Sequence, residues 1–425
     1  MANIINIQKI NVAADATEAG FHMGSSGIYV NGLSLQHPGR AYDEDPNWLL
    51  YVNENDGTAG KINIGGTATN DHGGGSVTAL HDGTLVFTRG GYFHSIAADL
   101  WTSDQPYDIS SWTQRLNDYV TASGGCCLSS AVTQNNKYLV VYRNGPNDTS
   151  ATGQTLLIYD PSTWTMESEV EIAHGETWEG HPLCPCYNWM RFDPRYNYIF
   201  VTWSWKENVD TNDNWGSAPF VYSDDNGTTW RKADGTAYSL PIYYSNADIP
   251  DDSIANDLYP YNYGPESGIT PNGTFYMAVP HRDVRGGTSY LYFYTWNGTN
   301  WVPHNLSTLI YSCAFSVGET KDFMVIAYAD AEEPNKLKVK ISSDDGETWS
   351  EPIVVDTLSS SDNIIGVSYC QPIEGYDDNY ARFFYAYYNP NTESMEQCDV
   401  KWIKFEIEEA KLYFGMTGNM VFKKF

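Results

Sequence analysis

Two stretches of this sequence carry the same eight-residue pattern: Ser223-Asp224-Asp225-Asn226-Gly227-Thr228-Thr229-Trp230 and Ser342-Ser343-Asp344-Asp345-Gly346-Glu347-Thr348-Trp349. Both fit Ser-x-Asp-x-Gly-x-Thr-Trp. The aspartate can accept hydrogen bonds from the turn that follows it, and the glycine can adopt a positive φ. The tryptophan at the end can pack between neighbouring sheets. Each stretch therefore predicts a tight turn that ends in a packed ring.

Short hydrophobic runs recur along the chain, and turn residues bound each of them. Examples are Leu85-Val86-Phe87 and Tyr198-Ile199-Phe200-Val201. Such aromatic and β-branched runs favour β-strands. The runs can be grouped into seven units, whose inner strands are predicted to begin near Trp48, Thr84, Lys137, Asn197, Thr274, Asp322 and Tyr380.

The spacing of these units, which averages about 50 to 60 residues, is typical of propeller blades. Closure of the ring would remove exposed edge strands, so we predict an all-β fold, a single seven-bladed β-propeller. The repeated octapeptide is then the Asp-box, with both copies on one rim. We expect the propeller to span residues 1–407 and residues 408–425 to form a short C-terminal hairpin extension.

The charge balance excludes several partners. A formal net charge of −29 would repel nucleic acid and anionic membrane surfaces. No apolar run approaches the roughly 20 residues that span a bilayer. The first residues, Met1-Ala2-Asn3-Ile4-Ile5-Asn6, lack the features of a signal peptide. We expect an extracellular or secreted protein whose signal is absent or removed, or alternatively a virion protein with assembly partners.

No cofactor is required by the sequence. The seven cysteines are expected to be small buried residues rather than a disulfide framework. Cys184-Pro185-Cys186 is too closely spaced for the usual zinc pair. Asp210-x-Asn212-x-Asn214-x-Gly216 resembles a calcium loop, but no acidic residue closes it. A structural calcium or zinc ion stays an open alternative.

Several phrases resemble those of one known family: His37-Pro38-Gly39-Arg40, Asn70-Asp71-His72-Gly73, Tyr107-Asp108-Ile109-Ser110-Ser111-Trp112, Val201-Thr202-Trp203-Ser204-Trp205-Lys206, and the first Asp-box with Arg231-Lys232-Ala233-Asp234-Gly235-Thr236 after it. Together they resemble the BNR-repeat family that contains the seven-bladed ulvan lyases and related rhamnosyl-glucuronate enzymes. The similarity runs from about Tyr29 to Trp349.

This resemblance implies β-elimination at a uronic acid, which needs a cation for the carboxylate, a base for the C5 proton and an acid for the leaving oxygen. The family's first histidine falls on His72 and its arginine on Arg143. Its second histidine falls near Tyr92, or on His94 if the alignment slips by two residues and keeps the same strand face. Its tyrosine falls at Cys126-Cys127, where a thiol does not simply replace a phenol.

A second set of residues is predicted to bind substrate: Tyr187, Trp189, Arg191, Trp203 and Trp205. Aromatic rings can stack on pyranose faces, although tryptophans in propellers also pack between blades. For Arg143 the two interpretations are a bidentate clamp on a uronate and a structural salt bridge.

Three hypotheses for function follow. The first is an enzyme acting on a uronate-containing polysaccharide, by β-elimination or glycoside hydrolysis, and His72 with Arg143 favours it. The second is a non-catalytic glycan-binding propeller, for example a phage tail or virion appendage protein, and the cysteines at the tyrosine position favour it. The third is a purely structural propeller. A sialidase is disfavoured, because no Arg-Ile-Pro phrase stands near the start.

Overall fold

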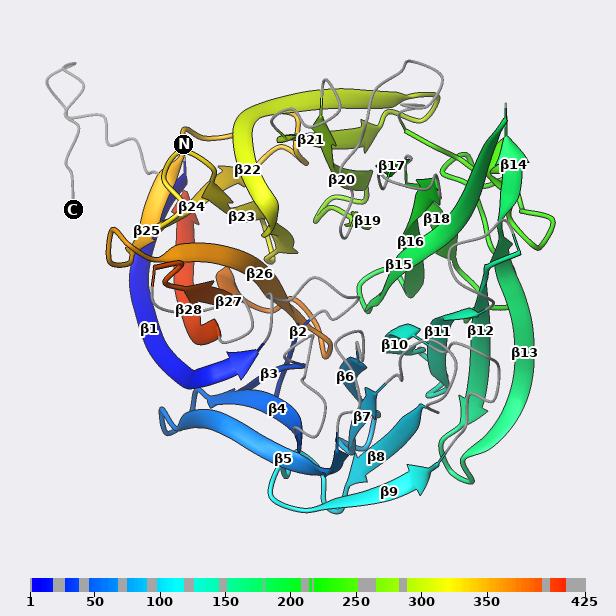
Figure 1. Cartoon of the computed structure of the whole chain (residues 1–425), viewed down its shortest axis with the longest axis horizontal. Helices are drawn as coiled ribbons and strands as arrows, with labels where there is room; N and C mark the ends of the chain where they lie inside the picture. The colour runs from blue at the N-terminus through cyan, green and yellow to red at the C-terminus, as the bar shows by residue number, and fades with distance from the viewer. Residues whose placement is uncertain are drawn as a thin grey trace, which may run out of the picture.

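The computed structural model is a ring of β-sheets around a central axis (Figure 1). It describes residues 2–17, 27–37, 46–67, 75–89, 98–117, 126–144, 151–178, 180–207, 214–215, 218–250, 265–282, 289–391 and 398–409. Within these ranges the helical structure is one short 3-10 helix, η1 (Tyr244–Asn246).

The first three blades of the ring have four strands each. Blade 1 contains β2 (Gly27–Val30), β3 (Leu33–Gln36), β4 (Pro46–Asn53) and β5 (Ala59–Thr67). Blade 2 contains β6 (Gly75–Ala79), β7 (Leu85–Arg89), β8 (Asp99–Ser103) and β9 (Trp112–Leu116). Blade 3 contains β10 (Cys126–Val132), β11 (Tyr138–Asn144), β12 (Gly153–Asp160) and β13 (Thr165–His174).

The remaining blades follow in chain order. Blade 4 contains β14 (Glu176–Trp178), β15 (His181–Asp193), β16 (Tyr198–Glu207), β17 (Asn214–Trp215) and β18 (Val221–Ser223). Blade 5 contains β19 (Glu266–Ile269), β20 (Phe275–Arg282), β21 (Ser289–Trp296) and the first part of β22 (Trp301–Glu319). Blade 6 contains the last part of β22, β23 (Met324–Asp330), β24 (Lys336–Ser342) and β25 (Ile353–Thr357). Blade 7 contains β26 (Asn363–Pro372), β27 (Tyr380–Tyr388), β28 (Cys398–Glu409) and β1 (Ala2–Thr17).

Hydrogen bonding joins these seven blades into five sheets. Blades 5 and 6 form one sheet because β22 is the outer strand of the first and the inner strand of the second. Blades 7 and 1 form another because β2 pairs in parallel with β26. The seven-bladed fold predicted from the repeat spacing is therefore the one observed.

The chain closes its own ring in blade 7. The N-terminal strand β1 lies outside β28 and pairs with it antiparallel, from Ala2 opposite Glu409 to Thr17 opposite Cys398 (Figure 1). Because the first strand of the chain completes the last blade, hydrogen bonds between the two ends of the chain close the ring. The proposed hairpin after Glu408 lies almost entirely outside the described residues.

Side chains on the first strands connect neighbouring blades across the axis side of the ring. In each case a backbone amide of one blade donates to a side-chain oxygen of another. The bonds are Ser130 N to Ser76 Oγ (3.2 Å), Met190 N to Ser129 Oγ (2.8 Å), Val317 N to Glu266 Oε2 (2.7 Å), Tyr369 N to Ser316 Oγ (3.1 Å) and Gly27 N to Ser368 Oγ (3.2 Å). Glu266 of blade 5 stands where blades 2, 3, 6 and 7 use serine.

The two Asp-box sequences form the same turn. In the first, the Ser223 hydroxyl accepts from Gly227 N (2.9 Å) and the Asp225 carboxylate accepts from Thr229 N (2.7 Å). The second repeats these bonds with distances of 2.8 and 2.9 Å. Both turns follow the third strand of a blade, so they lie on one rim, which we call the Asp-box rim. Trp230 is buried between blades 3 and 4, and Trp349 packs edge-on against Phe293 of blade 5.

The predicted starts of the inner strands need correction. They coincide with the starts of second strands such as β7 and β11, or with the third strand β4 in blade 1. The strands nearest the axis, for example β2 and β6, precede them in the chain (Figure 1). These strands include the glycines and serines that the inter-blade contacts require, so their hydrophobic pattern is weaker.

Candidate functional site

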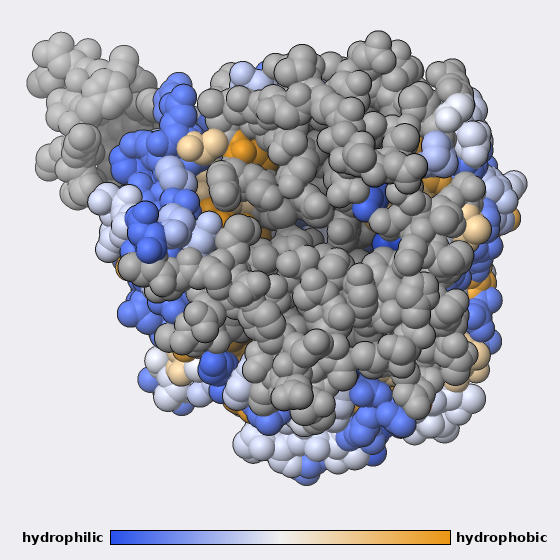
Figure 2. All heavy atoms as spheres, viewed as in Figure 1, coloured by the Kyte–Doolittle hydropathy of each residue, from blue (hydrophilic) through white to orange (hydrophobic). Residues whose placement is uncertain are grey.

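The two rims of the ring differ in what they carry. First strands run toward the Asp-box rim and second strands run away from it, because the two pair antiparallel. We call the opposite edge, where β7, β11 and β16 end, the loop rim. In Figure 2 the described surface around the periphery of the ring is mostly hydrophilic.

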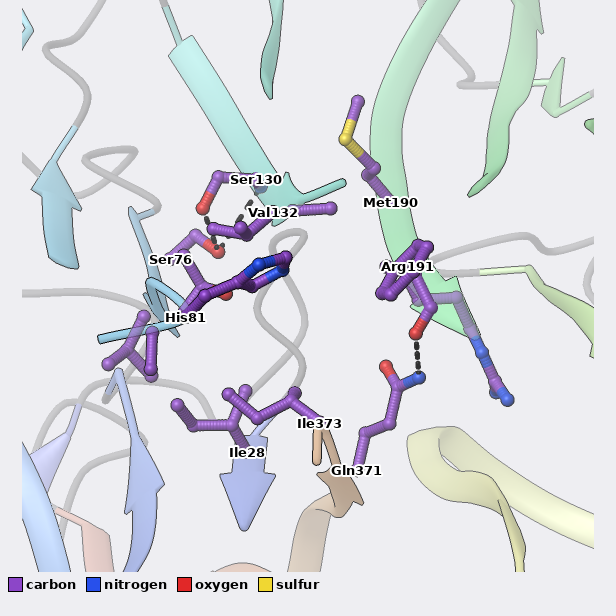
Figure 3. A pocket seen from close by; sticks show the side chains of 14 residues that line it. Ile28, Ser76, His81, Ser130, Val132, Met190, Arg191, Gln371 and Ile373 are labelled. Carbon is purple, nitrogen blue, oxygen red and sulfur yellow. Dashed lines mark hydrogen bonds between the residues drawn. The ribbon is translucent and has the colours of Figure 1, made fainter. Parts of the chain in front are cut away.

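A small axial cavity lies at the Asp-box end of the first strands. Its volume is about 50 Å³, and its lining includes Ser76, Ser130, Gln371 and His81, a residue of the turn after β6 (Figure 3). Pockets that bind drug-sized ligands usually measure about 300 Å³ or more. This cavity has room for a few water molecules, so it does not suit a polysaccharide.

A buried ion cluster lies beside that cavity. Arg191 donates from Nη2 to Glu319 Oε1 (2.7 Å) and from Nη1 to the Tyr276 hydroxyl (3.0 Å), and the Tyr376 hydroxyl lies 3.4 Å from Nη2. The guanidinium points away from the cavity in Figure 3. Burial lowers the pKa of Arg191, but Glu319 and the neighbouring hydroxyl groups outweigh it and hold the pKa well above its usual value.

The same cluster continues to the turn after β15. Arg195 donates to Asp193 Oδ2 (2.6 Å), and its guanidinium lies 4.0 Å from the ring centroid of Tyr376. Tyr376 thus contacts both arginines from the turn of blade 7. Because the cluster belongs to blades 4 to 7, we interpret it as a clasp between blades.

This geometry corrects part of the predicted binding set. Arg191 is 1% exposed at its side chain, so its carboxylate partner is Glu319 rather than a substrate. Trp203 and Trp205 are fully buried and form an edge-on pair at 5.8 Å between blades 3 and 4. Trp189 is also buried, 5.5 Å from the Arg191 guanidinium. The side chain of Tyr187 lies outside the described residues.

Basic residues gather at the loop rim instead. Arg89, Arg143 and Lys206 stand at or within one residue of the ends of β7, β11 and β16. They are only 4%, 4% and 9% exposed. Three successive second strands therefore bring a buried cation to one rim of a chain whose net charge is −29.

These cations project into three different interfaces, because successive strand residues face opposite sides. Arg89 shares a face with Phe87, which packs against blade 1. Arg143 shares a face with Val141, which packs against blade 4. Trp205 packs toward blade 3, and Lys206 is on the opposite face of β16. Lys206 shares that face with Phe200 and therefore points toward blade 5. The cations form an arc along the ring rather than one cluster.

His37 lies beside Arg89. Its ring centroid is 5.2 Å from that of Phe87, and a Cβ added at Gly75 would come within 2.6 Å of its Nε2. Burial, and then the charge of Arg89, lower the pKa of His37 to about 3. The imidazole is therefore neutral at physiological pH. Gly75 begins β6, three residues after His72, so His37 and Arg89 pack against the start of that strand.

Only part of the site predicted from the sequence lies within the described residues. Arg143 stands one residue before the end of β11, at the loop rim, and the backbone of Cys126 lies directly opposite it on β10. His72, Tyr92 and His94 lie outside the described residues. His37, Arg89 and Lys206 also lie at the loop rim, and they were not among the site residues predicted from the sequence. An alignment of the second strands with one another would have shown that β7, β11 and β16 each carry a basic residue at or next to their last position.

Metal ligation has no support among the described residues. Within these ranges, no group of three or more His, Cys, Asp or Glu side chains is arranged to hold a metal ion. Cys184 and Cys186 are buried free thiols with sulfur atoms 3.4 Å apart. Most of the calcium-like loop from Asp210 to Gly216 lies outside the described part of the chain.

Residues 41–309 match the BNR repeat-containing family. The chain belongs to that family. The match covers more than half of the chain and confirms the resemblance that the short phrases indicated. In the described part of this BNR repeat protein, no helix is long and apolar enough to cross a membrane.

Two solved structures share the fold of this BNR repeat protein. One is a PL25 ulvan lyase bound to -[GlcA(1-4)Rha3S]-, at 15% identity and a TM-score of 0.69, with 93% of this chain and 95% of that chain covered. The other is the polysaccharide lyase Uly1, at 10% identity and a TM-score of 0.66, with coverages of 93% and 92%. At these identities the likeness is one of fold. No curated protein sequence matches the chain.

Proposed function

We propose that this protein binds a uronate-containing polysaccharide at the loop rim and cleaves it by β-elimination. The observation that carries the proposal is the arc of buried cations at that rim. A strongly acidic chain repels acidic polymers in general, so a local group of cations is needed to attract one. Arg143 offers a planar fork that matches a carboxylate.

The reaction assigns a role to each predicted residue. Arg143 neutralises the uronate carboxylate, which makes the C5 proton more acidic. His72 takes that proton, a double bond forms between C4 and C5, and the bond from C4 to the leaving oxygen breaks. A second group, on Tyr92 or His94, gives a proton to the leaving oxygen. No water is consumed, and the product is an unsaturated uronate.

Two features of the comparisons support this choice. The chain shares its propeller fold with an ulvan lyase whose solved structure contains a bound -[GlcA(1-4)Rha3S]- segment. Its phrases also align with the lyase pattern at His72 and Arg143. A polysaccharide of this kind is an extracellular polymer, so we infer that the protein acts outside the cell or on a virion.

Glycan binding without cleavage is the second candidate. Cys126 occupies the strand position opposite Arg143, where the family pattern has a tyrosine. A thiol is a weaker hydrogen-bond donor than a phenol hydroxyl, so a cysteine does not simply take over the role of that tyrosine. If no other residue supplies that proton, the loop rim binds the polysaccharide but does not cleave it.

The deciding experiment compares wild type with His72→Ala and Arg143→Lys on glucuronate-containing oligosaccharides. Unsaturated product is followed by its ultraviolet absorbance, and new reducing ends are counted in parallel. We expect His72→Ala to abolish turnover. Arg143→Lys should weaken binding by about tenfold, because the lysine cannot form two parallel hydrogen bonds.

The remaining outcomes separate the alternatives. Reducing ends without unsaturation would replace elimination with hydrolysis. Binding without either product would favour the glycan-binding propeller. Absence of both binding and product, with a normally folded protein, would contradict the proposed function altogether.

A further inference from the structure

We propose that a cavity at the Asp-box rim, between blades 7 and 1, is a binding site for a neutral sugar. It lies on the rim opposite the proposed polysaccharide site, so this inference goes beyond the proposed function and does not depend on it. The cavity measures about 320 Å³, which is within the range of pockets that bind small ligands.

Three turns from two blades surround the cavity. They join β2 to β3, β4 to β5 and β26 to β27, and β2 lies directly beside β26 (Figure 1). Each of these turns follows a first or third strand, so all three lie at the Asp-box rim. The lining of the cavity includes Tyr29, Asn31, Asn55, Glu374, Asp377 and Arg382.

Buried charges fix the wall that β27 contributes. The Arg382 side chain is 2% exposed, and its guanidinium lies 3.7 Å from the ring centroid of Tyr29. It donates to Glu54 Oε1 (2.8 Å) and to Asp378 Oδ2 (2.9 Å). Lys404 also donates to Glu54, at Oε2 (2.6 Å). Because these contacts already hold the wall in place, a ligand does not have to order it on binding.

The two turns of blade 1 support each other. Asn31 and Gly32 have φ angles of 46° and 79°, as the two central residues of a tight hairpin turn require. The backbone amide of Glu54 donates to Gly32 O (2.8 Å). A Cβ added at Gly32 would lie 2.3 Å from Asn55 Nδ2, so the Asn55 amide packs against this glycine. The packing keeps Asn31 and Asn55 beside the same cavity.

Two of the three carboxylates of the cavity already have partners in the fold. Asp378 forms the ion pair with the guanidinium on β27. Glu374 accepts from the Tyr107 hydroxyl (2.8 Å) and from Asn31 N (3.2 Å). Asp377 is exposed, and within the described structure its carboxylate makes no hydrogen bond or ion pair. The cavity therefore has one free carboxylate.

The free groups of the cavity include donors as well as acceptors. The Asp377 carboxylate only accepts hydrogen bonds, whereas the amides of Asn31 and Asn55 both donate and accept. Neither amide forms a side-chain hydrogen bond to another residue of the described ranges. A sugar hydroxyl also donates and accepts, so adjacent hydroxyls can satisfy the carboxylate and an amide together.

Three other classes of ligand fit this cavity less well. A uronate would be repelled, because three carboxylates line the cavity with one arginine and the net charge of the chain is −29. An ammonium ion has no acceptor for the amide donors. For a metal ion, the part of the chain that the structure describes offers no suitable group of three or more His, Cys, Asp or Glu.

The experiment measures binding by ligand-observed NMR titration with the methyl glycosides of four neutral sugars: rhamnose, xylose, glucose and galactose. Glucuronate and methylammonium are the comparison ligands. Asp377→Ala and Asn55→Ala each remove one free group, and both residues are exposed, so the fold should be retained. Glu347→Ala is the matched control, because Glu347 is an exposed carboxylate of the second Asp-box, on the same rim.

We expect at least one neutral glycoside to bind. Asp377→Ala should weaken its binding about tenfold, as the loss of a charge-assisted hydrogen bond would. Asn55→Ala should weaken it about fivefold, since a neutral hydrogen bond contributes less. Asp377→Asn retains one acceptor oxygen and should recover part of the loss. Glu347→Ala and, at the opposite rim, Arg143→Lys should bind the glycoside as wild type does.

Four results would overturn the inference. They are no binding of any neutral glycoside, unchanged binding in both Asp377→Ala and Asn55→Ala, displacement of the glycoside by methylammonium at equal concentration, and loss of glycoside binding in Arg143→Lys. The third would make the cavity a cation site, and the fourth would place the ligand at the loop rim. The proposed function would stand in each case, because glucuronate binding and unsaturated product test it separately.

Discussion

Replacement of Arg191 by methionine separates a structural role from a substrate-binding one. The side chains of Arg191 and Glu319 are 1% and 0% exposed and form an ion pair at 2.7 Å. Removal of one partner of such a pair leaves the other charge buried without compensation, which costs about 3 to 5 kcal/mol. Arg191→Met should therefore lower the free energy of unfolding by that amount, measured by urea denaturation.

Two further variants test the cause. Arg191→Met combined with Glu319→Gln removes both charges, so the double variant should be more stable than Arg191→Met alone. Arg231→Met breaks the ion pair between Arg231 and Asp224, whose side chains are 29% and 37% exposed, so it should destabilise the protein far less than Arg191→Met does.

Binding of an acidic oligosaccharide provides the opposing readout. Folded Arg191→Met should bind glucuronate oligosaccharides as wild type does, because the guanidinium faces the clasp rather than the loop rim. An unchanged urea midpoint together with lost oligosaccharide binding would refute this reasoning. Arg191 would then be a substrate ligand, as the sequence pattern first indicated.

Two other substitutions probe the inner strands and the start of β6. Burial raises the pKa of Glu266 from 4.5 to about 7, so its contribution to stability is full below pH 4.5 and is lost as the pH rises through 7. The free energy of unfolding of Glu266→Gln should thus exceed that of wild type by up to about 3 kcal/mol at pH 8, and the two should be equal at pH 4. If variant and wild type have the same urea midpoint at pH 8 as well as at pH 4, this reasoning is wrong. Gly75→Ala should lose about 1 to 3 kcal/mol through overpacking, because the new Cβ would lie 2.3 Å from Thr88 O and 2.6 Å from His37 Nε2; unchanged thermal stability would show that the strand can shift.

The fold was predictable because its signals are local. Each Asp-box places its serine, aspartate, glycine and tryptophan within eight residues, and the same turn hydrogen bonds recur in both copies. The second strands were found for a similar reason, since runs such as Tyr138–Asn144 are hydrophobic enough to stand out. The first strands were missed because their serines and glycines serve contacts with another blade.

The site was predictable only in part. Arg143 was chosen from a family phrase; the structure shows that it lies at the loop rim, and its role in binding stays a prediction. Trp203 and Trp205 were misassigned as binding residues, because an aromatic ring suits a sugar platform and a blade interface equally well in sequence. Arg89 and His37 are separated by 52 positions along the chain, and only the packing of blade 1 on blade 2 brings them together.

The all-β class, the repeated blade, the two Asp-box turns and the acidic net charge could all be predicted from the amino-acid sequence. Those properties depend on residues that are neighbours in the chain or on sums over it. The tertiary structure decided which strands line the axis, that Arg191 is paired with Glu319, and which interface each basic strand end faces. These depend on ring closure, because a side chain's partners on a propeller belong to the adjacent blade, and that blade is specified by residues far away in the sequence.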